Sequence, residues 1–286
     1  MLKNIFQLIR FPGIFTAFSN VLIGFFLVSN GNFEFNLLPF LLTTTGLLFA
    51  GTMVMNDYAD RKIDSVERPK RPLPSGKISQ NAALYLTIVC FSIANLSALM
   101  ISETSIIISL LMTGLIISYN FKLKNITSVG IFTISIIRFL NIVLGFSIIE
   151  LSVDVLPYAI PLGIYVAGIS ILAKNELNTN SKDGILNKIF LIGTITSVIY
   201  LIIQNYSEVS IIFLGIFSIL IFFSWKNYKT NISKVVTIQI LGIILLDAVI
   251  VSLSNEFVYG VILSSFIIPA YIITKKLYIT QLYTKN

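Results

Sequence analysis

Polar side chains at short, regular intervals are gathered in one block of the sequence, NDYADRKIDSVERPKRPLPSG, which covers residues 56–76. On a helix, Asn56, Asp60 and Asp64 follow one another at intervals of four and share a face, with Asp57 close to it. Carboxylates at this spacing repel one another mildly, and a bound cation would relieve the repulsion. Because the chain has no histidine, oxygen ligands and a hard ion such as Mg²⁺ are favoured over zinc.

Basic side chains follow the acids directly. The prolines at 69, 72 and 74 stop the helix, and the stiff stretch around them carries Arg61, Lys62, Arg68, Lys70, Arg71 and Lys77. Carboxylates bind a metal ion and cationic groups bind phosphate oxygens, so the block predicts a receptor for Mg²⁺ and a diphosphate. The alternative interpretation is a solvated loop beside a membrane, whose basic residues contact anionic lipid heads.

The rest of the chain is strongly apolar. Of 286 residues, 56% are hydrophobic and 12% are charged, whereas about a quarter of an ordinary soluble domain is charged. Apolar runs of about 17–24 residues recur from end to end, each long enough to cross a bilayer as a helix. We expect an all-α bundle of nine to ten transmembrane helices, from the runs at 13–30, 38–56, 82–101, 104–120, 126–149, 155–173, 185–204, 208–225, 234–253 and 257–274.

The charges are distributed unevenly between the two ends of these runs. With ten spans, the lysines and arginines outside the apolar runs fall on one side, and the opposite loops carry Glu34, Glu103, Glu150, Asp154, Glu208 and Glu256. The positive-inside rule then places the loop at 56–81 and both termini in the cytoplasm. Because topology explains the net charge of +7, we expect membrane lipid rather than nucleic acid as the surroundings.

No linker or low-complexity tract divides the chain, so we expect a single transmembrane domain over residues 1–286. The two longest hydrophilic segments, 56–81 and 174–187, follow the second and the sixth runs. An offset of four helices indicates an internal duplication, with corresponding loops on the same side of the membrane.

A few polar residues lie inside the apolar runs. Arg138 and Asp247 would each be costly alone in hydrocarbon, and they could pair across the bundle. Asn141 shares a helix face with Arg138, which gives Arg138 a second interpretation, as a wall residue facing a diphosphate or an acceptor. Asn20 and Gln239 are predicted to form hydrogen bonds between helices.

The spacing NDxxDxxxD, followed by a basic stretch that ends in RPLPSG, resembles the first aspartate-rich motif of the UbiA superfamily of intramembrane prenyltransferases. Arg10 and Pro12 before the first run are similar to the family pattern, and Tyr119 with Lys124 resembles its YxxxxK loop. The stretches IIRFLNIVLGFS, ILAKNEL and PAYIITKKLYIT resemble the EboC-like branch of that superfamily.

The resemblance implies a prenyltransferase in the cell membrane of a prokaryote. It would move a prenyl group from an isoprenyl diphosphate to a lipophilic acceptor at the cytoplasmic face. The implied metal ligands are Asn56, Asp57, Asp60 and Asp64; the implied catalytic residues are Asp60, Asp64, Tyr119 and Lys124; the implied substrate-binding residues are Asn56, Arg68, Arg71, Arg138, Asn141 and Glu176.

The second aspartate motif of the superfamily is degenerate in this chain. After the sixth run the sequence reads AKNELNTNSKDG, in which Glu176 and Asp183 are the acids. Fewer carboxylates predict weaker or single Mg²⁺ binding. A non-catalytic carrier of isoprenoids or other lipophiles, or a transporter derived from the same fold, is therefore the alternative function.

Overall fold

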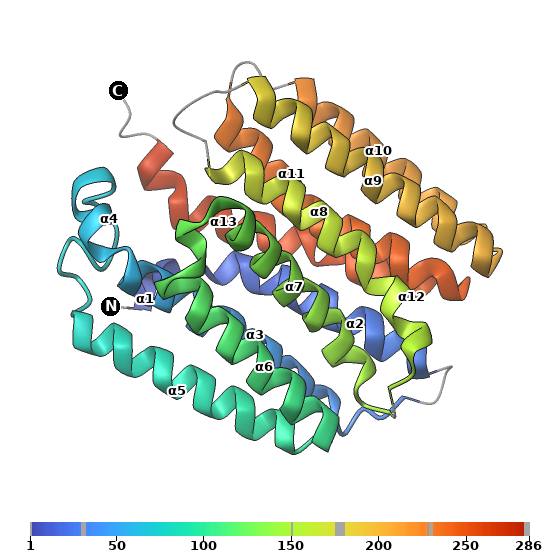
Figure 1. Cartoon of the computed structure of the whole chain (residues 1–286), viewed down its shortest axis with the longest axis horizontal. Helices are drawn as coiled ribbons and strands as arrows, with labels where there is room; N and C mark the ends of the chain where they lie inside the picture. Colours follow the sequence, from blue (N-terminus) through green and yellow to red (C-terminus); the bar gives the residue numbers. More distant parts are fainter. Residues whose placement is uncertain are drawn as a thin grey trace.

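The computed structural model describes residues 2–29, 33–149, 151–174, 181–226, 228 and 231–282. Within these residues every regular element is a helix (Figure 1). In chain order they are α1 (Leu2–Leu8), η1 (Phe11–Gly13), α2 (Ile14–Ser29), α3 (Leu38–Ala59), α4 (Arg61–Glu67), α5 (Gln80–Leu99), α6 (Glu103–Phe121), η2 (Leu123–Asn125), α7 (Thr127–Phe146), η3 (Val153–Val155), α8 (Leu156–Lys174), α9 (Ser181–Asn205), α10 (Val209–Lys226), α11 (Ile232–Val251), η4 (Ser252–Ser254), α12 (Phe257–Ser265) and α13 (Ile267–Leu282).

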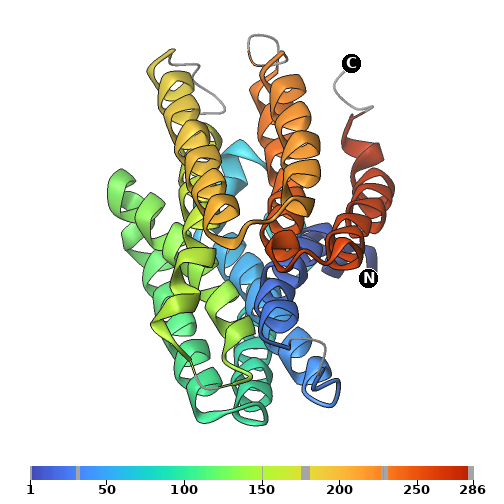
Figure 2. The same cartoon turned by 90° about the vertical axis from the view of Figure 1, so that its right-hand side faces the viewer.

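Ten helical stretches in the described part of the chain are long and apolar enough to cross a membrane, which confirms the ten predicted runs. They run roughly parallel to one another, and α13 lies at the outer edge of the bundle (Figure 2). The last stretch, Phe257–Leu277, is divided at Phe266 between α12 and α13. Pro269 lies in the first turn of α13, where a missing N–H group costs nothing.

The bundle is organised around α11, which is the most deeply buried of the ten stretches. One apolar core extends from α2 to α12 and includes large, fully buried side chains such as Tyr165 and Phe217. The outer helices instead expose large hydrophobic residues, for example Ile88, Ile192 and Ile219. In a chain of this composition such a surface faces lipid.

A pair of glycines brings α2 and α7 into backbone contact. A Cβ added at Gly24 would lie 2.3 Å from the Gly145 carbonyl carbon, and one added at Gly145 would lie 2.0 Å from the Val21 carbonyl oxygen. Only glycine allows helices to approach this closely. This contact places the polar face of α7 directly against α2.

Two similar serine clusters close the ends of helices on the same side of the bundle. The Ser102 hydroxyl caps α6 and donates to the Ser147 carbonyl oxygen at the end of α7, over a separation of 45 residues. Ser207 makes the matching bond to the Ser252 carbonyl oxygen at the end of α11, over the same 45 residues. The second cluster lies four spans after the first, which supports the predicted internal duplication.

Candidate active site

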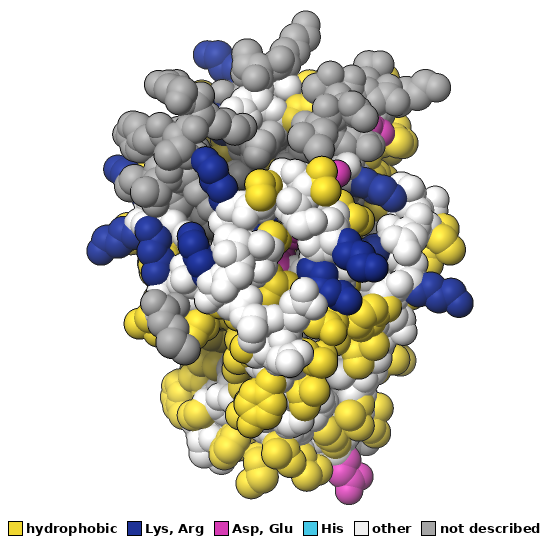
Figure 3. Space-filling model, turned by 90° about the vertical axis from the view of Figure 1, so that its left-hand side faces the viewer, with side chains coloured by type: hydrophobic (Ala, Val, Ile, Leu, Met, Phe, Trp, Pro, Cys, Tyr) yellow, Lys and Arg dark blue, Asp and Glu magenta, His cyan; other side chains and the backbone are white. Residues whose placement is uncertain are grey.

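A cavity of about 890 Å³ opens at the end of the bundle opposite the serine clusters. Basic side chains are spread over the face that contains its mouth, with acidic side chains visible between them (Figure 3). The polar residues that line the mouth are Arg10, Asn56, Glu67, Arg68, Lys70, Arg71, Tyr119 and Asn120. The inner part is lined by apolar residues of α3, α6, α7 and α11, together with the polar residues Thr45, Arg138 and Asn141.

The junction of α3 and α4 carries the acidic motif. Backbone hydrogen bonds from Asp60 N to Asn56 O (2.9 Å) and from Asp64 N to Asp60 O (2.8 Å) continue the helical pattern across the junction. The backbone therefore stays helical across the junction, although Asp64 does not share the face of Asn56 and Asp60 that its spacing predicted. Beyond Arg68, the residues of RPLPSG form tight turns, and Gly76 has the positive φ of 72° that the last turn requires.

A small apolar cluster anchors the basic loop. Leu73 is buried against Leu8 of α1, Val54 of α3 and Ala83 of α5. The Ser79 hydroxyl then caps α5 by accepting from Ala82 N (3.2 Å). Because Leu73 is fixed below, the preceding arginines and Lys70 are held over the cavity mouth.

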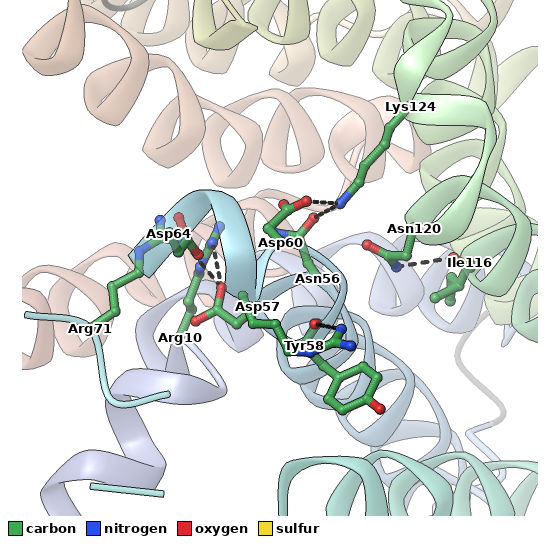
Figure 4. A network of polar contacts seen from close by, with 11 residues as sticks. Arg10, Asn56, Asp57, Tyr58, Asp60, Asp64, Arg71, Ile116, Asn120 and Lys124 are labelled. Carbon is green, nitrogen blue, oxygen red and sulfur yellow. Dashed lines mark hydrogen bonds and ion pairs between the residues drawn. The ribbon is translucent and has the colours of Figure 1, made fainter. Parts of the chain in front are cut away.

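Asp57 and Asp64 form one ion-paired group (Figure 4). Arg71 donates to Asp64 Oδ2 (2.7 Å) and to Asp57 Oδ1 (3.3 Å), and Arg10 donates to the same oxygen of Asp57 (3.3 Å). Both acidic side chains are only 4% exposed. A buried carboxylate is costly unless it is paired, so these arginines account for the burial of two acids beside a membrane.

Asn56 and Asp60 form a second group on the other side of α3 (Figure 4). Lys124 reaches them from η2, with its Nζ atom 2.5 Å from Asp60 Oδ1 and 3.5 Å from Asn56 Oδ1. Asp60 is 25% exposed and Lys124 is 17% exposed. This ion pair brings Lys124 of the YxxxxK loop against Asp60 of the acidic motif.

The four predicted metal ligands consequently do not gather into one patch. Nowhere in the described ranges do three acidic, cysteine or histidine side chains come together. The donor set nevertheless fits Mg²⁺, which proteins often hold through one or two carboxylates and the phosphate oxygens of a substrate. Asn56 and Asp60 are the residues that would hold it, because their oxygens already converge on one cationic group.

The inner end of the cavity corrects one prediction. Arg138 and Asp247 do not pair directly: Arg138 Nη1 donates to Asn20 Oδ1 (3.0 Å), and Asn20 Nδ2 donates to Asp247 Oδ2 (2.6 Å). Asn20 therefore bridges the two charges, which are too far apart to touch when α2 lies between α7 and α11. Asn141 accepts from Thr45 (2.7 Å) and donates to the Ala17 carbonyl oxygen (3.0 Å).

Other sequence predictions have mixed outcomes. Gln239 joins α11 to Asn187 of α9 by two hydrogen bonds, as expected of an interhelical partner. Glu176, in the degenerate second motif, lies outside the described residues. Arg61 donates to the Tyr58 carbonyl oxygen (2.8 Å) and stacks on the Tyr58 ring.

Sequence reasoning did not select two polar residues at the mouth as site residues. Arg10, which directly precedes η1, forms an ion pair with Asp57. Its position two residues before Pro12, as in the family pattern, was the indication in the sequence. Asn120 donates to the Ile116 carbonyl oxygen, but its buried Oδ1 atom has no hydrogen-bond partner. An amide in the last turn of an apolar span, beside Tyr119, is the pattern that indicates such a residue.

Fold and site together define a polytopic membrane protein whose cavity joins a charged mouth to an apolar interior. The model of the UbiA prenyltransferase family matches residues 17–231, and the chain belongs to that family. Its assignment to the EboC-like branch stays a prediction.

Curated relatives match part of the chain. Digeranylgeranylglyceryl phosphate synthase of Saccharolobus solfataricus is 33% identical over 123 residues, which are 43% of this chain and 44% of that protein. The same enzyme of Methanothermobacter thermautotrophicus is 36% identical over 118 residues, 40% of this chain and 41% of that protein. The chain thus spans less than half the length of these relatives.

Solved structures share the fold along most of the chain. A digeranylgeranylglyceryl phosphate synthase structure has a TM-score of 0.64 at 20% identity, covering 94% of this chain and 98% of that one. A UbiA homolog from Aeropyrum pernix has a TM-score of 0.69 at 15% identity, covering 83% and 96%. A UbiA homolog from Archaeoglobus fulgidus, bound to GPP and Mg²⁺, has a TM-score of 0.55 at 15% identity, covering 92% and 99%.

Proposed function

We propose that this protein is an integral membrane prenyltransferase and that residues 1–286 form its single domain. It moves a prenyl group from an isoprenyl diphosphate to a lipophilic acceptor, with Mg²⁺ as cofactor. The mouth of the cavity and both termini face the cytoplasm. The observation that carries the proposal is a group of cationic and oxygen-bearing side chains at the mouth of a cavity whose deeper lining is mostly apolar. The names of the relatives and the GPP- and Mg²⁺-bound homolog support it.

The diphosphate is received by the basic loop. Arg68 and Lys70 are exposed at the mouth and form no ion pair within the described ranges, so their charges are available to phosphate oxygens. Arg71 and Lys124 are already paired with acids. When the diphosphate binds, some of their N–H groups donate to its oxygens instead. Tyr119 lies at the same rim, where its hydroxyl group contacts the diphosphate.

The bond between the prenyl carbon and the diphosphate oxygen breaks, and its electron pair leaves with the diphosphate. Arginine and lysine side chains stabilise the charge that develops on the leaving group. Mg²⁺, when bound at Asn56 and Asp60, supplies further positive charge for the same purpose. The acceptor then attacks the allylic cation and loses a proton, which completes the transfer.

The apolar wall of the cavity protects that cation. Leu48, Met53 and Met112 lie between the mouth and the polar inner residues, with Ile116 and Ile137 beside them. These side chains give the prenyl tail an apolar environment and exclude water, which would otherwise capture the cation.

The experiment is release of pyrophosphate by protein in lipid nanodiscs, given radiolabelled geranylgeranyl diphosphate and Mg²⁺, with a membrane extract as the acceptor source. We expect release together with a labelled lipid product. Asp60→Ala and Asp64→Ala should abolish both diphosphate binding and release, whereas Glu103→Ala, an exposed acid at the opposite end, should leave them unchanged. Equal binding by all three variants would refute the site.

A carrier is the second candidate, favoured by the absence of a three-acid group among the described residues. A carrier would bind the diphosphate without releasing pyrophosphate. Protection of the protein against proteolysis by geranylgeranyl diphosphate, with no release over hours, would establish this function in place of the transferase.

A further inference from the structure

We propose that Arg138 binds an anionic group of the acceptor, a phosphate or a carboxylate, at the inner end of the cavity. The proposal rests on the proposed prenyl transfer and names the class of acceptor that this site takes. Asn20 and Asp247 serve as positioning residues for Arg138.

The location of Arg138 separates it from the diphosphate site. It lies about 16 Å along α7 from Thr127, at roughly 1.5 Å per residue, and it lines the cavity together with Thr45 and Asn141. Lys124 and the other cations of the mouth lie beyond the start of α7, whereas Arg138 lies near its middle. A donor diphosphate held at the mouth therefore leaves Arg138 to a different ligand.

The guanidinium group of Arg138 has spare hydrogen-bonding capacity. Within the described chain it makes one hydrogen bond, to Asn20 Oδ1 (3.0 Å), and it lies over the Phe49 ring, 5.5 Å from the ring centre. An arginine carries several further N–H groups in a planar fork that matches a carboxylate or a phosphate. These two contacts hold the side chain in place and leave donors for a ligand in the cavity.

The bridge behind Arg138 fixes the orientation of Asn20. Asp247 is fully buried, and its Oδ2 atom accepts from both Ser19 (2.5 Å) and Asn20 (2.6 Å). Because an acceptor oxygen can bind only the NH₂ end of the amide, the carbonyl end of Asn20 must face Arg138. The second oxygen, Asp247 Oδ1, is buried without a hydrogen-bond partner.

A purely structural ion pair would bring the two charges into contact, since each is costly when buried alone. Here the carboxylate is held one side chain away from the guanidinium group. Asp247 thus orients Arg138 and partly balances its charge without occupying its remaining donors. The arrangement is that of a prepared receptor for an anion.

The chemistry of the cavity also favours an anion at this place. Asp247 balances the charge of Arg138 only in part, so the guanidinium group still repels the allylic cation that forms in the same cavity. An acceptor with a negative charge on Arg138 removes the repulsion. A neutral acceptor does not.

The test compares two acceptor pairs that differ in charge, with geranylgeranyl diphosphate as donor in nanodiscs. One pair is geranylgeranylglyceryl phosphate and geranylgeranylglycerol; the other is 4-hydroxybenzoate and 4-hydroxybenzamide. The wild-type protein should show a KM at least about tenfold lower for the anionic member of one pair, an effect of about 1.4 kcal/mol. The pair that shows it identifies the anion as phosphate or carboxylate.

Arg138→Gln should bring that ratio close to one while the KM for the donor stays unchanged, and Arg138→Lys should keep part of it. Asp247→Asn should raise the KM for the anionic acceptor more than it lowers kcat. Gln239→Leu is the matched control, a buried polar residue on the same helix that does not line the cavity. It should lower the melting temperature and leave the ratio intact.

The proposal is overturned if the wild-type protein prefers neither anionic acceptor, in KM or in thermal stabilisation by the acceptor alone, or if Arg138→Gln keeps the preference. Thermal stabilisation decides the question for any variant or acceptor that gives no turnover. Failure of the proposed function would look different, because pyrophosphate release and Asp60-dependent binding of the donor would be absent with every acceptor.

Discussion

The acidic residues at the two polar regions of this cavity have different kinds of partner. At the mouth, Asp57, Asp60 and Asp64 each contact a cation that comes from another segment, and the cations keep 17–40% of their side-chain surface exposed. At the inner end, Asp247 is fully buried and contacts an amide and a hydroxyl group instead.

The difference shows which charges can change partners. The pair of Lys124 with Asp60 is partly exposed and costs little to open, so Lys124 can exchange its carboxylate for a diphosphate, whereas Arg71 holds buried carboxylates. A carboxylate inside hydrocarbon cannot be exposed without a large cost, so the bonds of Asp247 stay fixed. The exposed ion pair at the mouth can therefore change partners, whereas the fixed bonds at the inner end orient Arg138.

Removal of the metal ion should have the largest effect. With EDTA, we expect pyrophosphate release to fall by more than about 100-fold, because a metal ion contributes several kcal/mol to stabilising such a charge. The melting temperature of the ligand-free protein should not change, because cations of the chain already pair with the mouth acids. A large drop in melting temperature with EDTA would mean that the metal is structural.

Loss of Arg71 should mainly affect the mouth. Arg71→Ala leaves Asp64 buried without its cation, and we expect the free energy of unfolding to fall by about 1.5–3 kcal/mol. Thermal unfolding in detergent measures this change. Adding Asp64→Asn should recover most of it, and failure to do so would show that Arg71 stabilises the fold through some other contact.

Separation of α2 from α7 should disturb the inner end and spare the mouth. In Gly145→Ala the new methyl group would meet the Val21 carbonyl oxygen, and such overpacking costs about 1–3 kcal/mol. The melting temperature should fall while the donor KM is unchanged. Gly114→Ala is the control, because a Cβ there meets nothing within 4 Å; equal effects of the two variants would contradict a specific contact.

The smallest effect concerns Lys124. Its ammonium group competes with a metal ion for Asn56 and Asp60, so Lys124→Met should bind Mn²⁺ about two- to fivefold more tightly without diphosphate, the value of a partly exposed ion pair. Electron paramagnetic resonance of Mn²⁺ measures this affinity. The exposed neighbour Lys122 offers the control Lys122→Met; weaker binding by Lys124→Met would show that the two cations do not share the site.

The helices and much of the mouth were predictable, because both depend on local features of the chain. Long apolar runs predicted the ten spans, and the spacing of Asn56 and Asp60 placed both side chains together at the end of α3. The roles of Asn20 and Gln239 as interhelical partners followed from their position in hydrocarbon. Each of these inferences uses a stretch of sequence no longer than one transmembrane helix.

The pairings between distant segments were not predictable in the same way. The contact of Arg10 with Asp57 joins residues 47 positions apart, and Lys124 reaches Asp60 over 64 positions. Which acid meets which cation depends on the crossing of the helices. Asn20 separates Arg138 from Asp247 because the glycine contact holds α2 close against α7. The hydropathy of the sequence does not predict which helices make such a contact.

The two serine clusters have a consequence for the response of the bundle to ionic strength. They join helix ends through bonds between neutral groups, which dissolved ions do not screen, whereas ion pairs join the opposite end. At a physiological salt concentration the screening length is about 8 Å, and it shortens as salt is added. Added salt therefore weakens the partly exposed pair of Lys124 with Asp60 at one end more than the serine bonds at the other end.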